Sequence, residues 1–217
     1  MAKNQPSILS SKYLNDWYLF AVIVTPMCIA ALMKMSTTDL STPAGTGAMI
    51  TFSVRLAVPW LFLAFAASSL FYVFRDPFSK WLLKNRRIIG LCFASGMAWQ
   101  LFFIVILTTV HYDYYMANEN GIHSLVERVP GYLFLFAMTI TSFKFARRKL
   151  SSKHWRLLHK TGIYFLWGVM FSAYWYELFY YEDIQMIDYV YFWMGFAAWG
   201  FRMLAWTKKR SLKPLTN

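Results

Sequence analysis

Charged residues are scarce in this sequence: Asp, Glu, Lys and Arg make up only 15% of its 217 residues, whereas 58% of the residues are hydrophobic. A soluble domain carries about 25% charged and about 45–50% apolar residues. The apolar residues also stand in long blocks, which excludes a soluble globular enzyme, a disordered chain and a fibrous protein. We therefore expect an integral membrane protein.

Cysteines are also few. Cys28 and Cys92 both lie inside apolar segments, so a disulfide framework and a zinc site are excluded, and packing is their expected role. The sequence has no Walker motif, no dinucleotide-binding glycine motif and no zinc-protease motif. The chain therefore has no catalytic domain of its own, and any part in an enzyme is that of a redox subunit working with a partner.

Six apolar blocks are candidate membrane spans, since a helix needs about 20 residues to cross about 30 Å of hydrocarbon. They lie at roughly 17–33, 50–73, 88–110, 130–146, 161–181 and 189–206. The expected fold class is an all-α integral membrane bundle of six transmembrane helices. The expected organisation is a polar segment at 1–16 that is not cleaved as a signal peptide, a transmembrane domain at 17–206 and a basic tail at 207–217.

The basic residues predict the orientation of this bundle. Of the 22 Lys and Arg residues, 19 fall in residues 1–16, in the connections at 74–87 and 144–160, and in the tail together with Arg202 just before it. Eight of the ten acidic residues fall toward the other side. We therefore expect both termini to be cytoplasmic. This bias accounts for the formal charge of +12, so the expected surroundings are a lipid bilayer and no nucleic acid.

Polar residues within a span are candidates for function. Arg55, near the start of the second span, is interpreted either as reaching the outer headgroups or as contacting an anionic group inside the bundle. Gln100, midway along the third span, is interpreted either as a hydrogen bond between helices or as a donor in a ligand pocket. Arg202 is expected to reach the inner interface.

The histidines bear on a metal or haem site. His159 opens the fifth helix, as an interfacial hydrogen-bonding residue or as a ligand. Haem in a helical bundle normally needs a facing axial ligand on another helix. His111, His123 and His154 fall in predicted connections, so no second histidine is expected to face His159. Glu177, in the outer half of the fifth span, is interpreted as an interfacial carboxylate or a proton-relay residue.

Two segments carry a family resemblance. Residues 85–100 (NRRIIGLCFASGMAWQ) contain a basic pair, Gly-Leu and the start of a helix, and residues 146–165 contain a basic stretch and the helix entrance Trp155-x-x-Leu158-His159. Together they resemble the ferric-reductase-like transmembrane domain family over about residues 50–180. Within that family they are most similar to the haem-binding membrane subunit of bacterial methionine-sulfoxide reductase, the MsrQ/YedZ-like group.

The resemblance implies a multi-pass subunit of the bacterial inner (cytoplasmic) membrane. Such a subunit moves electrons through haem b, from a flavin or quinol donor to a periplasmic or membrane redox partner. Gln100 stands where the family has one haem histidine, and Ser172 stands where it has another, 13 residues after His159. The resemblance thus implies degenerate haem ligation, with His159 as the candidate iron ligand and Gln100 and Arg55 as candidate pocket contacts. Quinone is a second candidate cofactor.

Two other functions remain open. The replaced histidines also suit a haem-free accessory or anchoring subunit of a larger membrane complex. A small transporter is less favoured, because transport pathways usually show several buried charges or helices broken by Gly or Pro, and here Pro26 and Pro59 are the only prolines well inside spans.

Overall fold

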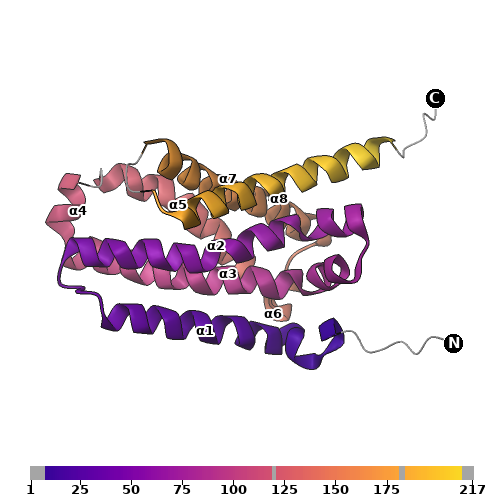
Figure 1. Cartoon of the computed structure of the whole chain (residues 1–217), viewed down its shortest axis with the longest axis horizontal. Helices are drawn as coiled ribbons and strands as arrows, with labels where there is room; N and C mark the ends of the chain where they lie inside the picture. Colours follow the sequence, from indigo (N-terminus) through magenta and orange to yellow (C-terminus); the bar gives the residue numbers. More distant parts are fainter. Residues whose placement is uncertain (1–7, 119–120, 181–183, 212–217) are drawn as a thin grey trace.

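The structure, a computed structural model, describes residues 8–118, 121–180 and 184–211, with the backbone alone for 118 and 121–127. Within these ranges all regular structure is helical, which confirms the all-α fold class. The elements are η1 (Ile8–Ser10), η2 (Lys12–Leu14), α1 (Asp16–Ser36), α2 (Pro43–Phe74), α3 (Pro77–Val110), α4 (Tyr112–Asn118), α5 (Gly121–Ile140), α6 (Lys144–Arg147), α7 (Ser152–Tyr180) and α8 (Met186–Ser211). The six long helices run back and forth along one axis, so the start of α1 and the end of α8 lie at the same end (Figure 1).

Among the described residues, three helices are long and apolar enough to cross a membrane, namely α1, α2 and α3. Within α5 the stretch Arg128–Ile140 is apolar but shorter. This confirms the expectation of a multi-pass membrane protein, while the number of six spans stays a prediction.

A tight hairpin joins α2 to α3. Arg75 ends α2 in the left-handed backbone region, with φ 55°, and Asp76 then caps α3 by accepting a hydrogen bond from the amide of Ser79 at 3.1 Å. Pro77 follows at the first helical position, where its missing N–H costs nothing. The hydrogen bonds from Ser79 hold the pKa of the Asp76 carboxyl below its usual value. The hairpin therefore turns within two residues.

Helices extend into segments that the sequence analysis treated as connections. The prediction of a connection at 74–87 was wrong for most of its length, because capping by Asp76 starts α3 at Pro77. His159 does not open its helix, since α7 begins two turns earlier at Ser152. His123 and His154 lie in α5 and α7, so their assignment to connections was also wrong.

The interior consists of two hydrophobic clusters that share α2. One cluster joins α2 to α7 and α8 through Phe62, Leu166 and Phe192, and the other joins α2 to α1 and α3 through residues such as Leu19 and Ile89. In a bilayer, helices associate through close packing rather than through exclusion of water, so small residues stand at the contacts. Figure 1 shows α2 and α3 side by side in the middle of the bundle.

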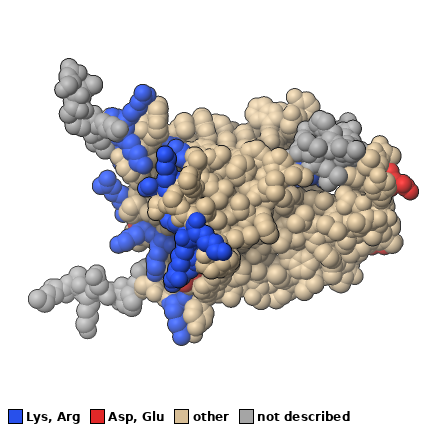
Figure 2. Space-filling view, turned by 180° about the vertical axis from the view of Figure 1, so that it is seen from behind, with Lys and Arg blue, Asp and Glu red and all other residues tan. Residues whose placement is uncertain are grey.

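Charge divides the molecule along its length. On the face shown in Figure 2, Lys and Arg side chains gather at one end, and a carboxylate lies at the opposite end. We call the first the basic end. It contains the start of α1, the turn between α2 and α3, α6, the start of α7 and the end of α8.

Candidate haem and electron-transfer site

His159 lies on α7 near the basic end, against the residue that follows α5. Its Nε2 is 3.0 Å from the hydroxyl oxygen of Thr141, and its ring lies against the Trp155 ring with centroids 4.3 Å apart. The indole N–H of Trp155 donates to the carbonyl oxygen of Thr141 at 3.1 Å. These contacts tie the first turns of α7 to the end of α5 and fix the imidazole between them.

The hydrogen bonds of Thr141 determine which ring nitrogen of His159 carries the proton. The Thr141 hydroxyl donates to the carbonyl oxygen of Ala137 at 2.7 Å, and one hydroxyl has only one proton to give. It therefore accepts from Nε2–H of His159, a tautomer assigned from the hydrogen-bond network. In this tautomer Nδ1 carries the ring lone pair.

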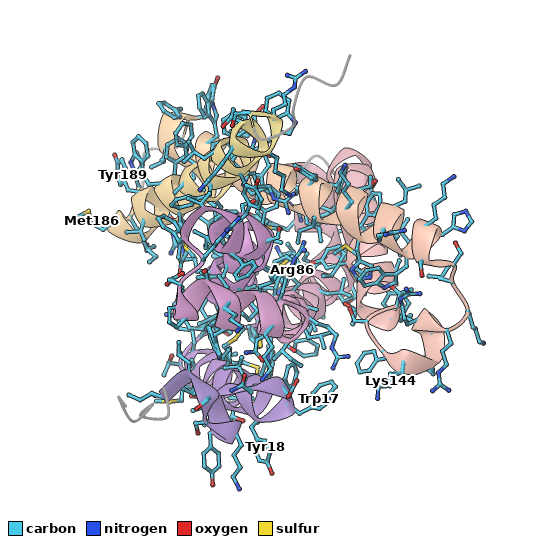
Figure 3. All side chains as sticks on the ribbon, turned by 90° about the vertical axis from the view of Figure 1, so that its right-hand side faces the viewer. Trp17, Tyr18, Arg86, Lys144, Met186 and Tyr189 are labelled. Atoms are coloured by element: carbon cyan, nitrogen blue, oxygen red, sulfur yellow. The ribbon has the colours of Figure 1, made fainter. Side chains whose placement is uncertain are left out.

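Two arginines near the basic end turn toward α2. Nε of Arg86 on α3 donates to the carbonyl oxygen of Ala64 at 3.0 Å, and Nε of Arg202 on α8 donates to that of Phe65 at 3.1 Å. The Arg202 guanidinium also lies over the rings of Phe65 and Tyr164, 4.0 and 4.5 Å from their centroids. Seen from the basic end, Arg86 lies centrally among the helices, while Lys144 lies at the edge (Figure 3).

Arg86 repels Arg202 and also acts on His159. Arg86 and Arg202 are close enough for mutual repulsion, and His159 lies in the field of Arg86 and Arg147. Within the described residues the one ion pair joins Arg55 to Asp188, so neither Arg86 nor Arg202 has a carboxylate partner there. The cluster therefore presents positive charge and one imidazole to the interior. Arg202 bonds to α2 at the basic end, and the expectation that it reaches the inner interface stays a prediction.

Gln100 links two helices. Its Oε1 accepts a hydrogen bond from the hydroxyl of Tyr132 on α5 at 2.7 Å. Of its two interpretations, the structure contains the hydrogen bond between helices, which suits a half-buried amide in a membrane. Gln100 bonds within α5, whereas His159 bonds to Thr141 just after α5.

Ser172 faces away from the bundle. It is exposed, and its hydroxyl donates to the carbonyl oxygen of Val169 in its own helix at 3.0 Å. At about 100° per residue, 13 residues turn a helix by about 220° beyond whole turns, so residue 172 lies nearly opposite residue 159. A ligand at this position would not share a face with His159.

Arg55 lies at the end opposite the basic end and contacts an acidic residue. Its guanidinium donates to both carboxylate oxygens of Asp188 at 3.0 and 2.9 Å and to Oε1 of Gln185 at 2.7 Å. Tyr191 donates its hydroxyl proton to the carbonyl oxygen of Arg55 at 2.9 Å. Arg55 is thus fixed in an ion pair at the start of α8, apart from the contacts of His159.

Tyr174 is a buried residue that the sequence reasoning missed. Its side chain is 6% exposed, and its hydroxyl is the one buried side-chain polar atom without a hydrogen-bond partner in the described part of the chain. It stacks edge-on against Tyr191, with centroids 5.4 Å apart. The signal in the sequence was weak, because Tyr174 stands in a run of aromatic residues that resembles an interfacial belt.

The donors near the basic end fit a haem with one protein ligand and do not fit a bis-histidine haem. One imidazole and two guanidiniums without carboxylate partners suit an iron and two propionates. Neither Gln100, which is bonded to Tyr132, nor Ser172, which faces outward, offers a second ligand beside His159. No group of three or more His, Cys, Asp and Glu side chains that would hold a metal ion occurs in the described ranges.

The known proteins to which this chain is similar are bacterial MsrQ subunits. No protein-family model and no solved structure matches the chain. The chain is 29% identical over 140 residues to the protein-methionine-sulfoxide reductase heme-binding subunit MsrQ of Enterobacter sp. (strain 638). It is 30% identical over 140 residues to the MsrQ subunits of Salmonella paratyphi B and Salmonella newport. Each match covers 54% of this chain and 62% of the relative, so the chain spans less than two thirds of the relatives' length. The chain is therefore similar to the MsrQ heme-binding subunits over about half its length, which confirms the expected resemblance to that group.

Proposed function

We propose that this chain is a membrane redox subunit that binds haem b through His159 and passes electrons to a partner protein at its outer face. The observation that carries the proposal is the donor set near the basic end: one half-buried imidazole, with Arg86 and Arg202 turned inward and without carboxylate partners in the described ranges. Relatives named for heme binding support the same cofactor. When bound, haem would supply a one-electron carrier.

The proposed ligation is degenerate. His159 is the single protein ligand, and its use requires either Nδ1 or a ring rotation that releases Nε2 from Thr141. Arg86 and Arg202 would bind the propionates, which requires them to share or leave their carbonyl partners on α2. Gln100 and Arg55 are not part of this set, because each is bonded elsewhere. A quinol or a flavin protein remains the donor that the family resemblance predicts.

The proposed topology is six spans within 17–206, with 1–16 and 207–217 in the cytoplasm of a bacterium and the bundle in its inner membrane. Among the helices proposed to span the membrane, α5 is the shortest with 20 residues. A helix of that length is about 30 Å long, which matches the hydrocarbon thickness. The gathering of basic side chains at one end supports the orientation. A fluorescent protein fused after residue 217 should fluoresce, and alkaline phosphatase inserted at residue 40 should be active. The reverse pair of results would overturn the orientation.

The haem proposal is tested by the visible spectrum of the detergent-purified protein, oxidised and then reduced with dithionite, with a pyridine haemochrome count. We expect a Soret band, a broad visible band of the reduced protein, and a shift of the Soret band with carbon monoxide because one axial position lacks a protein ligand. The His159→Ala variant should lose these bands. His154→Ala is the matched control, since His154 is exposed on the same helix and bonds to Ser151. A flat spectrum from folded, haem-supplemented protein overturns the proposal.

The second candidate is a haem-free accessory or anchoring subunit. Two observations favour it: His159 Nε2 is already bonded to Thr141, and Gln100 Oε1 is already bonded to Tyr132. His159 and Gln100 thus both have partners within the protein, at positions where the family resemblance implies haem ligands. This function predicts a colourless purified protein, no spectral difference between His159→Ala and the parent, and a stable membrane partner that copurifies in stoichiometric amount.

A further inference from the structure

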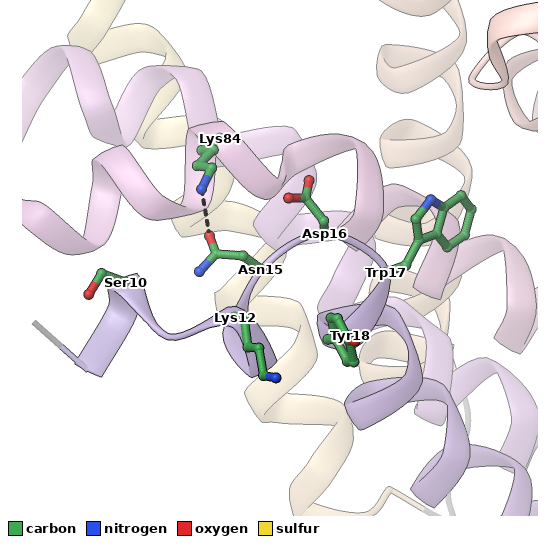
Figure 4. Close-up of a pocket in the computed structure, with 7 residues that line it drawn as sticks. All are labelled: Ser10, Lys12, Asn15, Asp16, Trp17, Tyr18 and Lys84. Carbon is green, nitrogen blue, oxygen red and sulfur yellow. Dashed lines mark hydrogen bonds between the residues drawn. The ribbon is translucent and has the colours of Figure 1, made fainter.

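A pocket of ≈ 400 Å³ lies at the basic end, where the chain enters α1. Its lining includes Lys12, Asn15, Asp16, Tyr18 and Lys84, and these side chains surround one hollow in Figure 4. The pocket is separate from the His159 cluster, because none of its lining residues belongs to that cluster. It is formed by two parts of the chain, η2 with the start of α1 and the second turn of α3.

Buried amides hold this pocket in shape. Asn15 and Asn85 are 7% and 1% exposed, and Nδ2 of Asn85 donates to Oδ1 of Asn15 at 3.1 Å. Oδ1 of Asn85 accepts from the backbone N–H of Asp16 at 3.1 Å, and the indole N–H of Trp81 donates to the carbonyl oxygen of Leu14 at 2.7 Å. Asp16 has φ 53°, a conformation that a residue other than glycine adopts at a cost. The cross-links to α3 therefore define the pocket before any ligand arrives.

The pocket carries positive charge. Lys84 donates to Oδ1 of Asn15 at 3.1 Å, and the Lys12 ammonium lies 5.1 Å from the Tyr13 ring centroid. Both lysines are exposed, and neither pairs with Asp16, since the one ion pair of the described ranges lies elsewhere. The lining therefore contains two positive charges and one negative charge. In addition, the side chain of Asn15 does not cap α1, so the positive end of that helix dipole also favours an anion.

The surroundings of the pocket point to a lipid. Trp17 and Tyr18 are exposed at the first turn of an apolar helix, which is where aromatic side chains meet the interface between headgroups and acyl chains. The Arg87 guanidinium lies 5.9 Å from the Trp17 ring centroid and adds a further positive charge. A ligand with a phosphate group and acyl chains therefore matches both the lysines of the pocket and the exposed aromatic side chains of Trp17 and Tyr18.

We propose that this pocket binds the phosphate of an anionic phospholipid headgroup, with Lys12 and Lys84 as the phosphate contacts and Trp17 and Tyr18 against the upper acyl chain. The inference rests on the membrane insertion of α1 and not on haem. The bound lipid would connect the start of α1 to α3 on the membrane side. Asn15 and Asn85 already connect the same two segments in the interior.

The test is native mass spectrometry of the detergent-purified chain, titrated with phosphatidylglycerol and with phosphatidylcholine. We expect one retained phosphatidylglycerol and none of the zwitterionic lipid. Replacing Lys12→Gln and Lys84→Gln together should weaken retention about 30-fold, since each lysine near an anionic lipid contributes about 1 kcal/mol and about 1.4 kcal/mol is tenfold. The charge-matched control is Lys153→Gln with Lys208→Gln, two exposed lysines outside the pocket, and its affinity should change less than about twofold.

Three outcomes would overturn the proposal. Equal loss in the pocket and control pairs would mean a general charge effect. Displacement of the lipid by millimolar inorganic phosphate would mean a site for free phosphate. No preference between the two lipids would remove the headgroup contact. Restoration of binding by Lys12→Arg with Lys84→Arg separates loss of charge from misfolding. The visible spectrum of the same preparations tests the haem proposal separately, because lipid retention does not require haem.

Discussion

Arg55 on α2 and Asp188 on α8 form a two-pronged ion pair between residues that are 133 positions apart in the sequence. The Asp188 side chain is 1% exposed and the Arg55 side chain 20%. Asp188 also accepts the backbone N–H of Gln185 at 3.1 Å, so the same carboxylate starts α8 and attaches it to α2. The pair closes the bundle at the end opposite the basic end.

Removing one partner of this pair should destabilise the fold. For Asp188→Asn we expect a loss of about 2–3 kcal/mol, somewhat below the about 3–5 kcal/mol of a fully buried pair, because Arg55 retains some solvent. The measurement is denaturation in detergent, followed by circular dichroism. Asp113→Asn, an exposed acidic residue, is the control and should change little. A loss below about 0.5 kcal/mol for Asp188→Asn would contradict a structural pair.

Tyr174 and Tyr191 should respond oppositely to loss of the hydroxyl. Tyr174→Phe removes a buried hydroxyl without a partner in the described ranges, so stability should stay level or rise by up to about 1–3 kcal/mol. Tyr191→Phe removes the hydrogen bond to the carbonyl oxygen of Arg55 and should cost about 1 kcal/mol. Thermal unfolding of both variants in one detergent gives the comparison. A destabilised Tyr174→Phe would show that this hydroxyl has a partner in the membrane.

Gly96 and Gly90 on α3 provide a packing test. A Cβ on Gly96 would lie 2.6 Å from the Cβ of Ala57, so Gly96→Ala must push α2 and α3 apart and should cost about 1–3 kcal/mol. A Cβ at Gly90 meets nothing within 4 Å, and Gly90→Ala should gain up to about 1 kcal/mol in helix propensity. Detergent unfolding curves distinguish the two. Equal effects would mean that α2 and α3 do not approach closely at Gly96.

Gln100 and Tyr132 should be coupled energetically. Gln100→Leu leaves the Tyr132 hydroxyl without its acceptor, and Tyr132→Phe leaves the amide oxygen without its donor, so each single change should cost about 1–2 kcal/mol. The double variant should cost less than the sum, because both polar groups are then gone. A double-mutant cycle measures the coupling. Additive effects would place Gln100 in a different contact, such as a ligand pocket.

Composition was sufficient to predict the helical membrane fold, and two local motifs indicated the similarity to MsrQ. Long apolar blocks have one stable solution in lipid, and the segments at 85–100 and 146–165 carry the family pattern in local spacing. The extent of each helix was less predictable, because the cap at Asp76 starts α3 before its apolar run begins. Such a cap is a local hydrogen bond that a hydropathy pattern does not contain.

The composition of the candidate site was harder to predict. His159 was found because histidine is rare here, with four in the chain. Arg86 and Arg202 were missed as a pair, because a basic residue near the end of a span usually reaches the interface. Their inward direction depends on two carbonyl groups of α2. These acceptors lie 22 residues from Arg86 and 137 residues from Arg202 in the sequence, so no local sequence pattern indicates the contacts. The Arg55–Asp188 pair has the same origin.

The hydrogen bonds from Arg86 and Arg202 to neighbouring carbonyls of α2 have a consequence for biogenesis. α2 is synthesised before α3 and long before α8, so in the proposed six-span topology its acceptors enter the bilayer before either cation. A guanidinium that finds a carbonyl acceptor on α2 enters the lipid at a lower cost than one without a polar partner. We therefore expect a chain whose α2 is moved behind α8 by circular permutation to insert poorly, even though every contact of the finished bundle is retained.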